Sequence, residues 1–145
     1  MTITAAEEVR AALVGAWRLL SLQNIGPDGS VEYPLGPDAI GQLVYTESGR
    51  MSAQLMRPGQ PRFQADNARQ AADAEVVAAY HNYASYYGGF RIDAEAGAVI
   101  HEVEGSSFPN MIGTDQVRYY RIDGDRLELE AGSPPGRAHV AWQKI

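Results

Sequence analysis

Short turn-forming clusters divide this chain at fairly even intervals and constrain its fold more than any other feature. Each cluster combines Gly with Asp, Pro or Ser, residues that reach positive φ or preset a turn. The segments between the clusters are five to ten residues long and rich in Val, Ile, Leu and Tyr. This spacing predicts an antiparallel all-β sandwich or barrel. The clusters are Gly26–Gly29, Glu47–Gly49, Asp93–Gly97, Asp123–Asp125 and Ser133–Gly136.

Nine segments between the clusters have the composition of strands, and three successive pairs form predicted hairpins. Apolar and acidic residues alternate clearly where Leu127 and Leu129 are interleaved with Glu128 and Glu130. Nine strands are enough to close a barrel and remove its exposed edges. We therefore expect an all-β, closed antiparallel up-and-down barrel of eight or nine strands. The predicted strands are Ala16–Gln23, Val31–Leu35, Ala39–Tyr45, Met51–Met56, Tyr86–Ile92, Val99–Glu104, Gln116–Ile122, Arg126–Ala131 and Ala138–Lys144.

One stretch departs from the strand pattern and predicts a helix. Residues Ala68–Ala84 are rich in Ala and poor in β-branched residues, a composition that favours helix. Asp73 is the expected N-cap, and Gly88–Gly89 is the expected stop. Four apolar residues recur at helical spacing and form a stripe on one face. The stripe consists of Val76, Tyr80, Tyr83 and Tyr87. The helix is thus inserted between the fourth and fifth strands of a single domain spanning residues 1–145.

Composition excludes several classes of protein. The 145 residues are 45% hydrophobic and 21% charged, which is ordinary for a soluble globular chain. The chain has no Cys, so disulfides, Cys-zinc sites and Cys nucleophiles are excluded. A net charge of -6 argues against a nucleic-acid partner, which requires a basic face. No apolar run approaches the roughly 20 residues of a membrane span, and the N-terminus lacks a signal-peptide pattern. We expect a cytoplasmic protein without a membrane partner, and a homodimer is one open alternative.

Five stretches, spread over nearly the whole chain, carry motifs that occur together in one family. The first strand opens with Gly15-Ala16-Trp17, a Gly-x-Trp sequence. The most specific motif runs from Glu102 to Asn110 and continues over Gly113–Arg118. The other stretches are Tyr33–Asp38, Gly41–Thr46 and Met51–Gly59. From about Leu13 to Trp142 the sequence resembles the bacterial and fungal lipocalin-like domain family of small intracellular β-barrels.

This resemblance implies a closed calycin-type barrel with a central cavity and a helical lid, here the helix around Val76–Tyr83. A Trp at the position of Trp17 usually plugs the closed end of such a barrel with a cation stacked across it. Arg118 or Lys144 is the expected cation. The resemblance implies no particular reaction, since many members have no assigned activity. Some related barrels in natural-product pathways act as cofactor-free cyclases or isomerases.

The three histidines do not have the spacing of a metal site. His81, His101 and His139 form neither a helical His-x3-His nor a His-x-His strand pair, so no metal is expected. His101 alternates with Val99 and Val103, so the three side chains face the same way. We expect that face to be the barrel interior.

A histidine inside an apolar barrel must find a hydrogen-bond partner or serve a ligand. His101 is therefore the tentative catalytic residue, a general acid or base that changes protonation near neutral pH. The alternative is a structural histidine bonded to a neighbouring Tyr or Glu. Whichever role His101 has, alternation along the strand places Glu102 and Glu104 on the opposite, solvent-facing side.

Tyrosines dominate the predicted ligand pocket. Tyrosine offers a large apolar body with one polar tip, which suits the lining of a pocket for a flat or polycyclic ligand. Methionine adapts to irregular space beside such a ligand. The predicted ligand-binding residues are Tyr33, Tyr45, Met51, Tyr83, Tyr86, Phe90, His101 and Tyr119.

We expect a barrel that binds a small, largely apolar molecule, in bacterial secondary metabolism, without a cofactor. A second hypothesis is a cofactor-free cyclase or isomerase acting on a polyketide-like or terpenoid-like substrate in the same cavity. Haem binding through His101 or His139 is a weaker hypothesis. Carrier and enzyme need the same cavity, so the sequence leaves open whether this protein is an enzyme.

Overall fold

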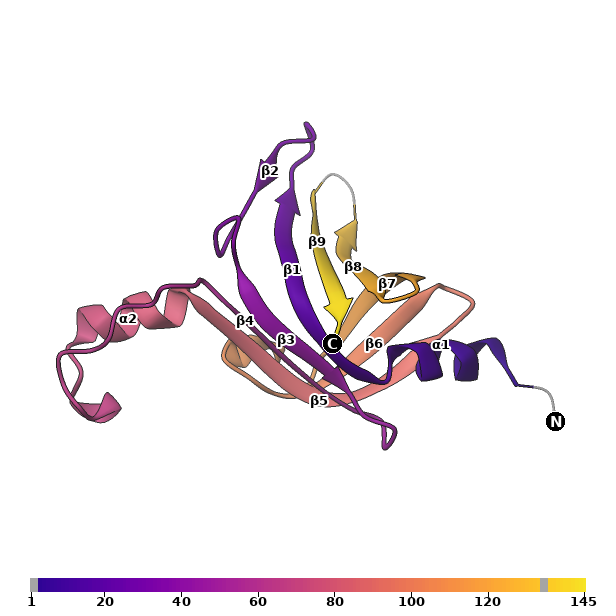
Figure 1. Ribbon diagram of the computed structural model, residues 1–145, viewed down its shortest axis with the longest axis horizontal. Helices are drawn as coiled ribbons and strands as arrows, with labels where there is room; N and C mark the ends of the chain where they lie inside the picture. The colour runs from indigo at the N-terminus through magenta and orange to yellow at the C-terminus, as the bar shows by residue number, and fades with distance from the viewer. Residues whose placement is uncertain (1–2, 134–135) are drawn as a thin grey trace.

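A closed antiparallel barrel dominates the computed structural model, which describes residues 3–133 and 136–145 (Figure 1). From β3 to β9, each described strand pairs with the next one along the chain. The pairing of β1 with β9 closes the ring, and it runs from Trp17 opposite Lys144 to Ile25 opposite Arg137. The predicted closed up-and-down barrel is therefore confirmed. The strands are β1 (Gly15–Ile25), β2 (Val31–Glu32), β3 (Ile40–Tyr45), β4 (Arg50–Met56), β5 (Tyr83–Asp93), β6 (Ala98–Ser106), β7 (Asp115–Asp123), β8 (Arg126–Ser133) and β9 (Gly136–Lys144).

Eight of these strands form the barrel, and β2 is an addition at the end of β1. The predicted second strand is too long, because only its first two residues pair. The Gly36 N–H donates to the Tyr33 carbonyl at 3.0 Å, with Gly36 at φ 85. This turn bends the chain and buries Leu35 in the core.

Glycines at positive φ make the three predicted hairpin turns. Gly49, Gly97 and Gly124 have φ values of 88, 70 and 58, a region that L side chains rarely adopt. The β3–β4, β5–β6 and β7–β8 hairpins form over these turns. Pro134 and Pro135 of the last predicted turn lie outside the described residues.

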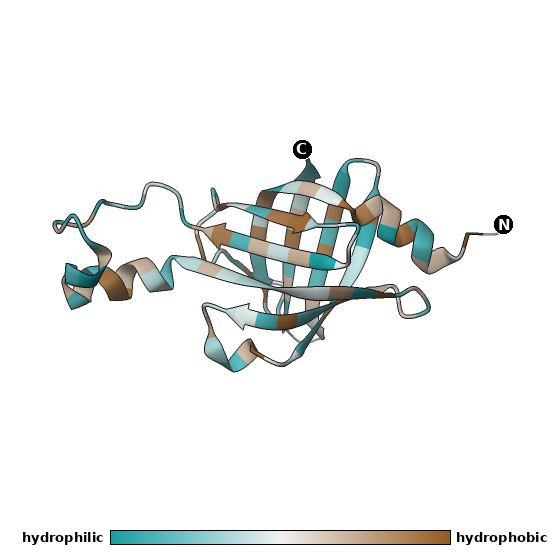
Figure 2. Ribbon diagram, turned by 90° about the horizontal axis from the view of Figure 1, so that it is seen from below, coloured by the Kyte–Doolittle hydropathy of each residue, from teal (hydrophilic) through white to brown (hydrophobic). Residues whose placement is uncertain are grey.

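Hydrophobic and hydrophilic residues alternate along several of the strands, as the hydropathy colours show (Figure 2). This pattern fits side chains that point in turn to the barrel interior and to its outer face. Each strand that alternates in this way contributes one face to a single apolar core. The core includes Trp17, Leu19, Leu43, Tyr45, Met51, Phe90, Val99, Leu127, Leu129 and Trp142.

One end of the barrel adjoins α1 (Ala5–Leu13), a helix that we did not predict. Thr4 and Glu7 form a capping box at its start, a sequence signal that was present. The indole Nε1 of Trp17 donates to the Leu13 carbonyl at 2.9 Å, which ties the helix to the Gly-x-Trp motif.

Lys144 is the cation that stacks on Trp17. Its Nζ lies 5.1 Å from the centre of the indole ring and donates to the Ala12 carbonyl at 3.1 Å. The other expected cation, Arg118, lies on the inner face of β7 instead. The structure thus confirms that Trp17 plugs one end of the barrel with a cation stacked on it, and that cation is Lys144.

The inserted helix, α2 (Asp73–His81), is shorter than predicted. Ala72 is its N-cap, with extended backbone and no side-chain cap, so the prediction of Asp73 as N-cap is wrong by one residue. Asn67 caps a separate short 3-10 helix, η1 (Ala68–Gln70). A second one, η2 (Pro109–Met111), interrupts the loop before β7.

The predicted tyrosine stripe is divided between α2 and β5. Tyr83 and Tyr87 pair with Met56 and Ser52 of β4, because ladder hydrogen bonds and the β-propensity of tyrosine favour a strand there. Gly88–Gly89 lies within β5 and does not stop a helix. None of the helices in the described ranges is long and apolar enough to span a membrane.

Candidate functional site

His101 lies inside the barrel and bridges two tyrosine hydroxyls. Its Nε2 is 2.7 Å from Tyr45 Oη, and its Nδ1 is 2.7 Å from Tyr86 Oη. The imidazole is 1% exposed, and the three residues come from β3, β5 and β6. Both ring nitrogens therefore have a tyrosine partner. This is the arrangement of a structural histidine, which the sequence analysis gave as the alternative to a catalytic one.

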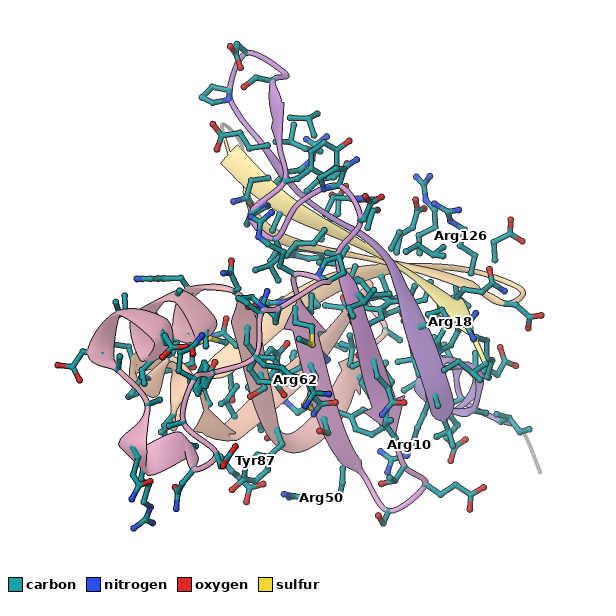
Figure 3. All side chains as sticks on the ribbon, turned by 60° about the vertical axis from the view of Figure 1, so that its left-hand side comes forward. Arg10, Arg18, Arg50, Arg62, Tyr87 and Arg126 are labelled. Carbon is teal, nitrogen blue, oxygen red and sulfur yellow. The ribbon has the colours of Figure 1, made fainter. Side chains whose placement is uncertain are left out.

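The predicted orientation of β6 is confirmed. Val99 and Val103 are buried on the same face as His101. Glu102 and Glu104 point outward: Glu102 pairs with Arg91 at 2.7 Å, and Glu104 pairs with Arg50, which lies on the outside of the barrel (Figure 3).

Aromatic and thioether side chains surround the Tyr45 end of this network. The Tyr45 and Phe90 rings meet edge to face, with their centres 4.8 Å apart. Met51 is buried opposite Tyr45 on β4. The Arg10 guanidinium of α1 lies 4.9 Å from the centre of the Phe90 ring. Tyr45, Met51, Phe90 and His101 thus form one buried cluster, with Tyr86 at its margin.

Burial keeps this network uncharged. Removal from water lowers the pKa of His101 to about 3, and the positive charge of Arg118 acts in the same direction. The expectation that His101 changes protonation near neutral pH is therefore wrong. Burial also raises the pKa of Tyr45 and of Tyr86, and Arg118 partly opposes the rise in each case.

Arg118 is a member of the site that the sequence analysis did not identify. It lies on the half-buried face of β7, where its Nη2 donates to Gln116 Oε1 at 3.4 Å. Gln116 Nε2 donates to Thr114 Oγ1 at 2.8 Å, and Thr114 Oγ1 donates to the Met111 carbonyl at 2.6 Å. A chain of polar groups therefore leads from Arg118 to η2. The sequence analysis placed Tyr119 in the pocket, and alternation along the strand then assigned its neighbour Arg118 to the outer face.

The prediction that Tyr119 lines the interior is wrong by one residue. Tyr119 is 49% exposed, and Tyr120 occupies the half-buried inner position. Tyr and Arg occur on both faces of β7, so residue type does not distinguish its two faces. On the outer face Tyr119 borders a small pocket with Glu128 and His139.

Tyr33 and Tyr83 also lie outside the buried cluster. Tyr33 follows β2 and is 42% exposed, and Gln23 Nε2 donates to its hydroxyl at 3.4 Å. Tyr83 begins β5 and is 40% exposed. The structure therefore brings together five of the eight predicted pocket residues and leaves Tyr33, Tyr83 and Tyr119 apart.

The expected helical lid does not cover the barrel. In both ribbon views, α2 lies to one side of the barrel and projects away from it (Figures 1 and 2). Val76 and Tyr80 are 44% and 48% exposed, so the predicted stripe does not pack against a barrel mouth. The helix instead borders a cavity of about 600 Å³, whose other walls include Met56, Phe63 and Tyr83.

Comparisons with known proteins show what this chain is similar to. Residues 14–145 match the family described as "Lipocalin-like domain". The 4'-hydroxy-3'-methoxypropiophenone carrier protein of Aspergillus oryzae is 39% identical over 107 residues, which cover 66% of this chain and 96% of that protein.

Two solved structures are similar at 9% identity each. A fatty-acid-binding protein of Echinococcus granulosus has a TM-score of 0.43, with 93% of this chain and 98% of that chain covered. A mutant of the fluorescent protein UnaG has a TM-score of 0.41, with 91% and 95% covered. With the family match spanning nearly its whole length, this chain belongs to the lipocalin-like domain family.

Proposed function

We propose that this protein binds and carries a small, largely apolar molecule in the barrel interior. The observation that supports this proposal is a set of inward-facing apolar side chains that are only partly buried. They pack against the core on one side and leave apolar surface accessible on the other, which is the property of a ligand site. They include Leu22, Leu55, Tyr86, Tyr120 and Val140.

The relative from Aspergillus oryzae supports a carrier over an enzyme. Its name describes a carrier of an aryl ketone, and the matched region covers 96% of that protein. An acid–base enzyme is less well supported, because tyrosines occupy both nitrogens of His101 and its pKa is about 3. We therefore favour an aromatic ligand of similar size, held without covalent chemistry.

Filling the interior tests this function. Leu22 faces inward on β1 and packs against the core, whereas Leu20 is 40% exposed. Leu22→Trp should weaken binding of 4'-hydroxy-3'-methoxypropiophenone by about tenfold or more, because the indole occupies the ligand's space. Leu20→Trp is the matched control and should leave the affinity unchanged.

Isothermal titration calorimetry measures the affinities, and circular dichroism checks that both variants fold. Absence of binding to the unmodified protein would count against a carrier of this ligand. Equal affinities of the two variants would place the ligand outside the barrel.

A further inference from the structure

Arg118 is a cation on the inner face of β7, and no carboxylate of the described residues pairs with it. In the part of the chain that the structure describes, none of the ion pairs includes it. Its guanidinium contacts the Val117 carbonyl at 3.1 Å and Gln116 Oε1 at 3.4 Å. A guanidinium has five N–H donors and no acceptor, so donors remain for a further group.

Hydrogen counting shows which hydroxyl of the Tyr45–His101–Tyr86 network remains available. A neutral imidazole has one N–H and one bare nitrogen, so it can accept from only one tyrosine. Tyr45 is 1% exposed, and His101 is its hydroxyl's hydrogen-bond partner within the described residues. Its O–H must therefore donate to Nε2, because an unsatisfied buried hydroxyl hydrogen is unfavourable.

The proton of His101 then resides on Nδ1 and is donated to Tyr86 Oη. The hydroxyl hydrogen of Tyr86 is left without a role in the network. Tyr86 is only half-buried, and it is one of the inward-facing side chains of the proposed ligand site. Arg118 on β7 is within hydrogen-bonding reach of the Tyr86 hydroxyl on β5. The Tyr86 O–H and the remaining N–H groups of Arg118 thus provide donors at one place.

We infer that the ligand carries an acceptor oxygen, of a ketone carbonyl or a carboxylate, which receives hydrogen bonds from Tyr86 and Arg118. This inference rests on the proposed function and specifies the chemistry of its ligand. The deeply buried His101 and Tyr45 are positioning residues: they hold the Tyr86 oxygen as an acceptor and direct its hydrogen toward the ligand.

The first test is the tautomer of His101, which needs no ligand. Long-range ¹H–¹⁵N correlation spectra at pH 7 distinguish the two ring nitrogens, and His101→Asn identifies the signals. We expect the proton on Nδ1. A proton on Nε2 would leave Tyr86 donating to the imidazole and would overturn the inference.

The second test compares three probes of similar size: propiophenone, 3-phenylpropanoate and propylbenzene. Calorimetry should show propiophenone binding about tenfold more tightly than propylbenzene, the effect of about one hydrogen bond. Tyr86→Phe should lower that preference, because only Arg118 would remain as a donor to the ketone oxygen, and an unchanged preference would overturn the role of Tyr86. Arg118→Met should weaken 3-phenylpropanoate more than propiophenone, because only the carboxylate is charged.

Matched controls lie on the outer face of the same strand as Arg118. Tyr119→Phe and Arg121→Met should leave all three affinities unchanged. Equal binding of propiophenone and propylbenzene to the unmodified protein would refute the acceptor-oxygen inference and leave the carrier function standing. Binding of none of the probes would count against the proposed function and, with it, against this inference.

Discussion

His101 shows how one buried residue couples stability to pH. In the unfolded chain its pKa is near the ordinary 6.5, whereas burial lowers the folded value to about 3. Between these values the unfolded chain binds a proton that the folded protein does not. The stabilisation is therefore fully present above pH 6.5 and is lost as the pH falls toward 3.

We expect the free energy of unfolding to fall by on the order of 5 kcal/mol over this pH range because of His101 alone. Urea unfolding at a series of pH values measures it. His101→Asn should remove this part of the pH dependence, although it also lowers stability at neutral pH. His81→Asn, at an exposed position, is the control and should retain the wild-type slope. Parallel slopes for the wild type and His101→Asn would contradict the prediction.

At the scale of elements, β5 depends on close backbone approach at one glycine. The pairing of β5 with β6 shifts register between Tyr87 and Gly88, where the ladder has a bulge. A Cβ on Gly88 would overlap the Glu102 carbonyl, which is backbone and cannot move aside without disturbing β6. The bulge lies on β5 between Tyr86 and Phe90, and Phe90 is opposite His101 in the ladder. It therefore helps to set the position of Tyr86 relative to His101.

Gly88→Ala should therefore lower the free energy of unfolding by about 1–3 kcal/mol. Gly89→Ala is the matched neighbour, because its added Cβ would meet the flexible end of Glu102 at 3.2 Å. We expect a loss below about 1 kcal/mol for Gly89→Ala, measured by urea unfolding monitored with tryptophan fluorescence. A smaller effect at Gly88 than at Gly89 would show that β6 yields easily at the bulge.

At the scale of the whole molecule, the barrel is stable because β9 has partners on both sides. Val140 lies opposite Leu22 of β1 and Leu129 of β8, at the seam where the last strand meets the first. The short β2, by contrast, pairs among the described strands only with the end of β1. Closure therefore depends on residues more than a hundred positions apart in sequence.

A proline substitution should lower the free energy of unfolding by different amounts at the seam and in β2. Val140→Pro should cost about 3 kcal/mol or more, since proline lacks an N–H and fits poorly in a strand with two neighbours. Val31→Pro in β2 should cost about 1 kcal/mol or less, because edge strands tolerate proline. Near-ultraviolet circular dichroism and urea midpoints measure both. Equal losses would indicate that β2 is as important to the fold as the seam.

The sequence alone determined the three hairpins, most of the strands and the barrel class, because turn chemistry and side-chain alternation are local properties. The inward position of His101 followed from Val99 and Val103, which lie two residues to either side of it and therefore face the same way along the strand. On β7 the same reasoning failed, since Tyr and Arg occur on both of its faces and only the pairing with β6 and β8 selects Arg118 for the interior.

Only the tertiary structure decided which residues form the site and what covers the barrel. Tyr45 and His101 are 56 positions apart, and no local pattern links them. The tyrosines after α2 pair with β4 because ladder hydrogen bonds exceed the helical preference of a short segment. The helix at the covered end is α1, held by Trp17 and Lys144, which the closure of β1 on β9 brings together. These contacts join residues that are distant in sequence and depend on how the whole chain folds, which local propensity does not specify.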